Sequence, residues 1–360
     1  MSFLLTWLPT IIVFILMLAV LVLAHEFGHF IVAKRAGMTV EEFGFGFPPR
    51  IWGKKIRGTL YSINLIPLGG FVKILGEGEE SGSPHSFSSK SIKARIMVVV
   101  AGVVMNFILG YLAFLLAFWS GLPPMATSPS AYDGVIRSGS GGLIIKNIDT
   151  NSLAEKNNLQ INDTIMSVNQ RERTSVSDLR QILAENQRGT IEIKIQRDKK
   201  EFLQKIEIGE NKFLGVTLLE KIEKVDYVWW KVPYYALLET GRVIILATVK
   251  IGTVLKDLIV SRIVPEDIGG PVAIFGITSV AVQLGFAYVL SLFINLTIVI
   301  GIMNILPFPA LDGGRLIFLV VEKIRGRKIA QKVETAIHNI GFILLLVLLV
   351  LLTWRDVARF

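Results

Sequence analysis

His25-Glu26-Phe27-Gly28-His29 is an H-E-x-x-H motif that lies inside a long apolar stretch near the N-terminus. Residues 1–24 carry no charged side chain, and the apolar stretch resumes directly after the motif. Ionisable residues at membrane depth are costly and usually mark a functional site. Positions i and i+4 share one face of a helix, so His25 and His29 can direct two imidazoles at one metal ion. Glu26 lies beside them and can take a proton from a water molecule, so the motif predicts a zinc hydrolase site within a membrane-spanning helix.

The composition is typical of a membrane protein with several spans, because 52% of the 360 residues are apolar. The net charge is +9, but Lys and Arg mostly flank the hydrophobic stretches. Nucleic-acid binding would need basic residues clustered on one folded face, so we expect a lipid bilayer and no nucleic acid as partner. The chain has no cysteine, so a metal ion must be held by His, Asp or Glu. The N-terminal stretch lacks the positive start of a signal peptide and is too long for one, which predicts a retained span.

Four stretches are long and apolar enough for a helix of about 20 residues to cross a bilayer: Phe3–Ala33, Ile92–Trp119, Val280–Leu306 and Ile337–Leu352. The loop between the first two, together with the first turn of the second stretch, carries ten basic residues, and the loop after the third carries six. The positive-inside rule places both loops in the cytoplasm. We therefore expect a multi-span α-helical membrane protein, with membrane parts at 1–120 and 276–360 and the middle of the chain outside the cytoplasm.

The region 121–231 is polar and contains short alternating runs typical of β-strands, with a helical pattern at 177–185. Residues 154–169 resemble a characteristic segment of bacterial PDZ domains, with Asn158 and Asn162 where that pattern has glycine. Asparagine tolerates the left-handed backbone better than most residues, so the turns can form. This predicts one inserted extracytoplasmic α+β PDZ domain.

The region 232–275 is apolar but contains charged residues at intervals, among them Glu239, Arg242 and Lys250. These charges favour an amphipathic helix at the outer membrane surface over a fifth span. A fifth span would also reverse the orientation of the C-terminal half and break the agreement between the two basic loops.

A catalytic zinc ion usually has three protein ligands and one open position. The candidate third ligand is Asp312, in a segment 304–314 whose two prolines and two glycines interrupt the third apolar stretch. Irregular backbone at membrane depth occurs only where protein or a water-filled cavity meets it. An ordinary Asp-Gly turn outside the membrane is the simpler alternative for this segment alone. Glu322 is a conceivable substitute ligand.

The H-E-x-x-H motif, the N-x-x-P-x-P-x-L-D-G-G segment at 304–314 and the PDZ-like region together resemble the site-2 protease family of intramembrane zinc metalloproteases. The resemblance covers nearly the whole chain. It implies that His25, His29 and Asp312 bind Zn²⁺ and that Glu26 is the catalytic base. It also implies the bacterial inner membrane as location and single-span membrane proteins as substrates, first cut outside the membrane: an anti-sigma factor or signal-peptide remnants. The chain departs from the family at Ala101-Gly102, where a proline commonly follows.

Four residues are candidates for substrate binding. A helix must unwind before hydrolysis, and an added strand would hold it extended. Residues 60–73 alternate like a hairpin or an edge strand and contain Gly69 and Gly70, and a solvated cytoplasmic loop is the alternative. Asn304 could clamp the opened backbone, and Asn106 could hydrogen-bond toward the active site or a neighbouring helix. The remaining histidines, His85 and His338, are interpreted as bystanders.

Two other classes of function fit part of the pattern. A membrane scaffold built on the PDZ domain would not need Glu26. A metal-ion transporter could use the same three metal ligands, but transporters usually contain internal repeats and none is visible. The sequence does not indicate the oligomeric state.

Overall fold

The computed structural model describes residues 2–77, 81–126, 131–133, 136–137, 142–172, 176–185, 189–197, 200–207, 214–221, 224–261 and 269–359. The chain forms two compact units. The first combines Met1–Ala117 with Pro233–Phe360, and the second is Phe118–Val232. The second unit corresponds to the predicted inserted domain at 121–231.

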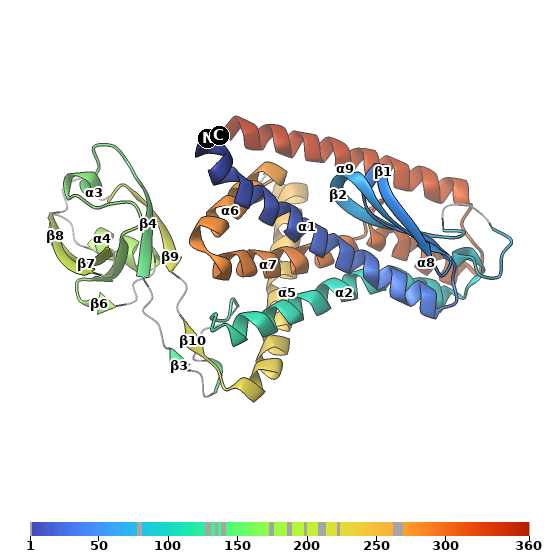
Figure 1. Cartoon of the computed structure of the whole chain (residues 1–360), viewed down its shortest axis with the longest axis horizontal. Coiled ribbons are helices and arrows are strands. Elements are labelled where there is room, and N and C mark those ends of the chain that lie inside the picture. The colour runs from blue at the N-terminus through green and yellow to red at the C-terminus, as the bar shows by residue number, and fades with distance from the viewer. Residues whose placement is uncertain are drawn as a thin grey trace. The chain divides into compact units, whose positions relative to one another are not determined.

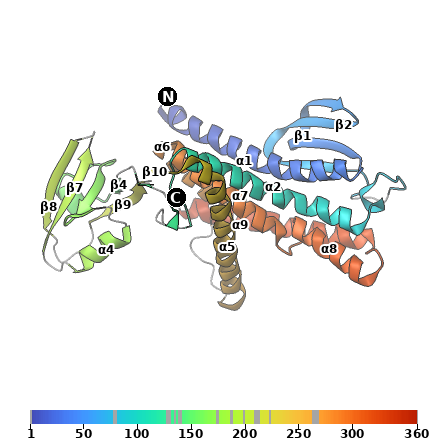
Figure 2. The same ribbon diagram turned by 90° about the horizontal axis from the view of Figure 1, so that it is seen from below.

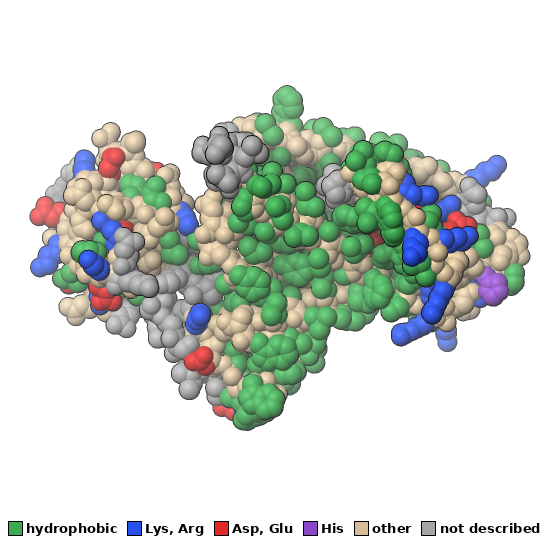
Figure 3. Space-filling view, viewed as in Figure 1, with side chains coloured by type: hydrophobic (Ala, Val, Ile, Leu, Met, Phe, Trp, Pro, Cys, Tyr) green, Lys and Arg blue, Asp and Glu red, His purple; other side chains and the backbone are tan. Residues whose placement is uncertain are grey.

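The first unit is a bundle of helices with one small sheet (Figure 1). Its helices are α1 (Ser2–Arg35), α2 (Ile92–Trp119), α5 (Val232–Lys256), α6 (Pro271–Leu284), α7 (Phe286–Ile305), α8 (Asp312–Arg325) and α9 (Gln331–Arg359). Four of the helices found among the described residues are long and apolar enough to cross a membrane, and they are α1, α2, α7 and α9. This confirms the four predicted apolar helices. On the face shown in Figure 3, apolar side chains cover the middle of this unit, and Lys and Arg gather where α1 ends and α2 begins.

The third predicted span, Val280–Leu306, differs from the structure because it begins inside α6. The helix breaks at Gly285, whose φ of 106° is a backbone conformation that favours glycine, and α7 starts after it. The predicted connector 232–275 ends at residue 275, which lies inside helix α6, so this predicted boundary also differs from the structure. Apolar residues continue on both sides of the break, so hydropathy alone could not show it.

Helix α5 runs across α2 and α7 in both views of the first unit (Figures 1 and 2). Its first half is packed against protein, since Ala236 and Glu239 are fully buried. Its second half exposes apolar side chains such as Ile245 and Val249. The choice between a surface helix and a fifth span therefore stays a prediction in favour of the surface helix.

Helices α1 and α2 cross at two glycines. A methyl group at Gly28 would overlap the backbone carbonyl of Ala101, and one at Gly102 would overlap the imidazole of His29. The two backbones therefore lie as close together as glycine permits. This brings α2 directly against the helix face that carries both histidines of the H-E-x-x-H motif.

The sheet of the first unit is formed by two long, bent strands, β1 (Val40–Ile56) and β2 (Thr59–Ile74). Phe43 of β1 pairs with both Tyr61 and Val72 of β2, so β2 folds back along both sides of β1. The last part of β2, residues 69–74, pairs with β1 on one side, and no strand in the described part of the chain pairs with its other side. The predicted edge strand within 60–73 therefore has an available edge.

Ion pairs and one capping carboxylate hold the helix ends of the bundle. Arg95 at the start of α2 donates to both carboxylate oxygens of Glu322 on α8, at 2.8 and 2.6 Å. Arg315 on α8 pairs with Glu77, which follows β2. Near the C-terminal end of α9, buried Asp356 accepts hydrogen bonds from the backbone N–H groups of Gly270 and Ala273 at 2.8 and 2.9 Å. Asp356 thereby satisfies N–H groups that the start of α6 leaves unpaired.

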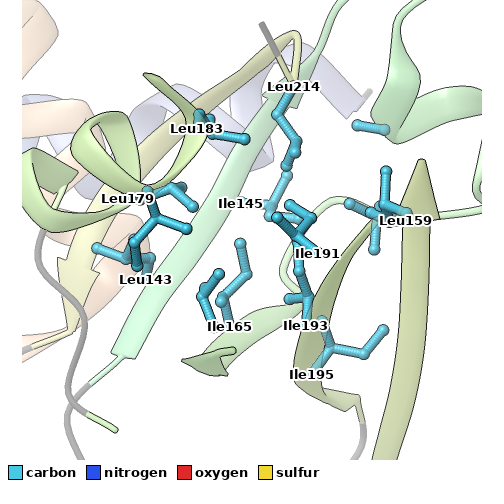
Figure 4. Close-up of a cluster of buried hydrophobic side chains, with 14 residues drawn as sticks. Leu143, Ile145, Leu159, Ile165, Leu179, Leu183, Ile191, Ile193, Ile195 and Leu214 are labelled. Atoms are coloured by element: carbon cyan, nitrogen blue, oxygen red, sulfur yellow. The ribbon is translucent and has the colours of Figure 1, made fainter. Parts of the chain in front are cut away.

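The second unit is a small α+β domain around one apolar core. Its main sheet has the strand order β8-β7-β5-β4-β9, with β6 paired to β5. The strands of this sheet are β4 (Gly142–Ile148), β5 (Thr164–Val168), β6 (Arg171–Glu172), β7 (Thr190–Arg197), β8 (Lys200–Glu207) and β9 (Val216–Lys221). Strands β3 (Ile136–Arg137) and β10 (Val225–Asp226) form a separate two-stranded sheet. The helices are α3 (Leu153–Lys156) and α4 (Val176–Glu185). Figure 4 shows Leu and Ile side chains of the sheet and α4 packed together. Asn158 and Asn162 adopt positive φ angles of 55° and 74°, as predicted for the glycine positions.

Candidate metal centre and active site

Three side chains from two helices converge on one point of the first unit. The Nε2 atoms of His25 and His29 on α1 lie 3.1 Å apart. Oδ2 of Asp312, the first residue of α8, lies 3.1 Å from Nε2 of His25 and 3.2 Å from Nε2 of His29. The sequence placed Asp312 near the two histidines, and the structure brings the three together.

The spacing of these three atoms fits a single zinc ion. Ligand atoms about 2.0–2.1 Å from zinc in tetrahedral geometry lie about 3.3 Å from one another, close to the separations of 3.1–3.2 Å seen here. Oδ2 of Asp312 is also buried without a hydrogen-bond partner among the described residues. Two ring nitrogens that face each other and a carboxylate oxygen form a donor set suited to a cation. His25, His29 and Asp312 could therefore hold zinc and leave a fourth position open.

The local fold explains how Asp312 reaches this point. Methyl groups at Gly313 and Gly314 would overlap the backbone carbonyls of Ile305, Leu306 and Phe308. The two glycines therefore let the first turn of α8 lie directly on the end of α7 and the segment after it. Asp312 occupies the N-terminus of α8, where the helix dipole favours a carboxylate.

Glu26 lies half-buried beside the three candidate ligands and interacts electrostatically with all of them. The edge of the sheet lies next to it. A methyl group at Gly70 on β2 would be 3.4 Å from Cγ of Glu26 and 3.0 Å from Val22. Gly69 has a φ of 92°, and a methyl group there would contact the ring of Phe47 at 2.9 Å. An extended peptide that pairs with this edge would therefore pass close to Glu26.

Of the two asparagines predicted for substrate binding, only Asn106 contacts the candidate ligands. Its Nδ2 lies 3.3 Å from Nδ1 of His25, and the residue is fully buried. This position favours a role in orienting His25 over contact with a substrate. Asn304 is half-buried in the last turn of α7, and its side chain makes no hydrogen bond with another described residue. Its proposed contact with substrate stays a prediction.

The sequence interpretation missed His338, which it treated as a bystander. Nδ1 of His338 on α9 accepts a hydrogen bond of 3.0 Å from the backbone N–H of Ala310. Ala310 lies two residues before Asp312 and has a φ of 77°, which is unfavourable for a residue other than glycine. His338 therefore stabilises the unusual turn that positions Asp312. A histidine at the start of an apolar stretch could have been noticed as a candidate functional residue. Its partner could not be predicted, because the contact with Ala310 depends on how α9 packs against the segment 304–314.

We expect His338→Ala to weaken zinc binding about fivefold, because losing one hydrogen bond costs about 1 kcal/mol and lets the turn relax. His338→Asn is the matched control, since its Oδ1 can accept from Ala310 where Nδ1 did. Zinc affinity is measured by chelator competition on the purified protein. His85→Ala should leave it unchanged, because His85 is exposed and contacts Gly37 rather than the segment 304–314. Equal affinities for all four proteins would show that His338 plays no part in positioning Asp312.

Two histidines and a glutamate on the apolar helix α1, with a carboxylate brought to them by α8, are the site of a metalloprotease of the membrane. The model of peptidase family M50 matches residues 13–348, so the chain belongs to this family and is a zinc metalloprotease. A protein of Clostridium acetobutylicum whose name places it among the zinc metalloproteases is 31% identical over 97% of each chain. The regulator of sigma-E protease RseP of Escherichia coli is 27% identical over 96% of this chain and 98% of its own. The zinc metalloprotease RasP of Oceanobacillus iheyensis is 28% identical, with 97% and 99% covered.

Proposed function

We propose that this protein is an intramembrane endopeptidase that cleaves the membrane-spanning segments of single-span proteins. The observation that carries the proposal is the position of the candidate metal centre. His25, Glu26 and His29 lie on α1, within a stretch long and apolar enough to cross a bilayer. A catalytic centre at that depth acts on peptide bonds that a soluble protease cannot reach. The similarity to RseP and RasP supports the same assignment.

In this proposal His25, His29 and Asp312 hold the zinc ion. Zinc supplies a Lewis acid that polarises the scissile carbonyl and lowers the pKa of a water molecule to about 7. Glu26 takes a proton from the attacking water and returns it to the leaving amine. Its half-buried position beside the three ligands suits that task. Asp312 contributes a negative charge that offsets part of the charge of the cation.

The free edge of β2 would hold the substrate in an extended form. Backbone groups of a helical substrate are tied in i to i−4 hydrogen bonds, so the scissile bond becomes accessible only after local unwinding. Pairing with residues 69–74 replaces those hydrogen bonds by strand hydrogen bonds. Gly70 lies next to Glu26, so the paired strand would place a carbonyl group close to the water molecule from which Glu26 takes a proton. Asn304 would hold the unwound backbone on the side of α7.

The second unit would select substrates that have lost their outer domain. We assign it as a PDZ domain on the extracytoplasmic side. The positive-inside rule favours a cytoplasmic position for the two basic loops of the first unit, and one membrane span separates the second unit from them. Strand β9 is at one end of the sheet order, and α4 contacts it. PDZ domains bind peptides by strand addition, and an edge strand beside a helix offers the groove that this needs. The substrate class would be anti-sigma factors or signal-peptide remnants in the bacterial inner membrane.

The test is cleavage of a tagged single-span substrate by the purified protein in lipid vesicles, with and without the outer domain of the substrate. We expect a cut within the membrane-spanning segment of the trimmed substrate only, mapped by mass spectrometry. A zinc chelator should stop the reaction, and added zinc should restore it. A cut outside the span would overturn the intramembrane assignment. Equal rates for trimmed and intact substrates would overturn the selection by the second unit.

A further inference from the structure

One face of α2 forms the wall behind the two histidines of the candidate metal centre. Val98, Gly102 and Asn106 are spaced four residues apart and therefore lie on the same side of the helix. Gly102 has no side chain, and a methyl group there would be 2.7 Å from Cε1 of His25 and would also overlap the ring of His29. The close approach at Gly102 brings its two neighbours on this face to the imidazoles.

Val98 holds His29 through its backbone. Nδ1 of His29 lies 2.8 Å from the carbonyl oxygen of Val98. A carbonyl can only accept, so Nδ1 of His29 carries the proton and Nε2 presents its lone pair to the position shared with Asp312. Partners of this kind fix the tautomer and ring orientation of metal-binding histidines.

Asn106 stands in the same relation to His25, with one difference in chemistry. The Nδ2 donor of Asn106 is 3.3 Å from Nδ1 of His25. If Nδ2 donates there, Nδ1 is the acceptor and the ring proton sits on Nε2. Nε2 of His25 is the atom that faces Oδ2 of Asp312 and Nε2 of His29, so it must be free of its proton to bind a metal ion.

A half-turn of the amide exchanges its oxygen and nitrogen without moving the side chain. Oδ1 then accepts from Nδ1–H of His25 and leaves Nε2 free for the metal ion. The position that Oδ1 now occupies is buried and has no hydrogen-bond partner among the described residues. The two orientations of the amide therefore differ only in the bond to His25.

The rest of Asn106 is fixed by packing against α7. Its backbone oxygen accepts a hydrogen bond of 3.2 Å from the hydroxyl of Thr297. A methyl group at Gly301 would be 3.3 Å from its Cβ, so the two helices are close at this point. The residue is fully buried and cannot touch a substrate from this position. Any effect of its side chain on the reaction must pass through His25.

We propose that Asn106 is a positioning residue that accepts the Nδ1 proton of His25 and so prepares Nε2 to bind the metal ion. The proposal rests on the metal centre proposed above and is independent of the substrate class. Loss of an outer partner of this kind typically lowers metal affinity by about 10–100-fold. Aspartate in place of Asn106 keeps a hydrogen-bond acceptor at this position but has no donor.

The experiment measures zinc affinity by chelator competition on the full-length protein in detergent, in the absence of substrate. We expect Asn106→Ala to bind zinc about 10–100-fold more weakly and Asn106→Asp to stay within a few fold of the wild type. Thr297→Val is the control, because it removes the contact of α7 with the Asn106 backbone and leaves the side chain in place. Its zinc affinity should not change.

Asn106→Asp decides the proposal even if Asn106→Ala does not fold. If Asn106 acts as a donor to His25, Asn106→Asp loses zinc affinity and the proposal fails. If Asn106 acts only by packing, the similarly shaped Asn106→Leu keeps the wild-type zinc affinity, and this result also overturns the proposal. Unchanged affinity in a folded Asn106→Ala also overturns it. His25→Ala serves as the reference: if this variant keeps the wild-type zinc affinity, the metal centre itself is wrongly assigned.

Discussion

Glu26→Gln is expected to lose about 10²–10⁴-fold in cleavage rate, the usual contribution of a general base. The amide has nearly the shape of the carboxylate but cannot take a proton from water. Zinc content should stay at the wild-type level, because Glu26 lies beside the three candidate ligands and is not one of them. The measurement pairs the cleavage rate in vesicles with metal analysis of the same protein preparation.

The control for this variant is Glu42→Gln on β1. Glu42 belongs to the same unit and pairs with Arg50 at 3.3 Å, so the substitution removes a charge without touching the metal centre. Its rate should be close to that of the wild type. If Glu26→Gln cleaves at the wild-type rate, Glu26 is not the base. If it loses zinc as well as activity, the substitution has damaged the centre and the chemical role of Glu26 has to be tested in another way.

The membrane helices could be predicted from the sequence because a bilayer imposes a length and a composition on each span. The four apolar helices were found for this reason. The break at Gly285 was not, because one glycine in an apolar stretch does not reveal whether the chain turns there. Strand β1 was not predicted either. Its pairing with both halves of β2 depends on contacts between residues that hydropathy does not connect, such as Phe43 with Val72.

The candidate site follows the same division between local and distant contacts. His25 and His29 could be placed on one helix face because their spacing is local. Asp312 could be named as a candidate from the interrupted third apolar stretch, but it lies 283 positions after His29 (312 − 29), and the resemblance to a family was needed to imply that it binds the same metal ion. The place of His338 at the start of an apolar stretch did not reveal its partner, because His338 contacts the backbone of Ala310. Val98 has no sequence signal, because it contacts His29 through its own carbonyl. Contacts made by the backbone leave no trace in the side-chain sequence.

Asp312→Ala is expected to remove zinc from the protein and to abolish cleavage. The loss in zinc affinity should exceed the roughly 10–100-fold typical of an outer partner, because this substitution removes a ligand itself. Two histidines would remain, and catalytic zinc usually needs three protein ligands. Zinc content after purification and chelator competition give the result, with thermal unfolding in detergent as a check that the variant is folded.

Glu322→Gln is the comparison that separates the two carboxylates of α8. Glu322 lies ten residues after Asp312, which is about 15 Å along a helix at 1.5 Å per residue. Both of its oxygens accept from Arg95, and this ion pair holds the carboxylate at the start of α2. Glutamine can still accept from Arg95, and zinc content should therefore stay at the wild-type level. If zinc is instead kept by Asp312→Ala and lost by Glu322→Gln, the third ligand is Glu322, and the convergence of Asp312 with His25 and His29 has another cause.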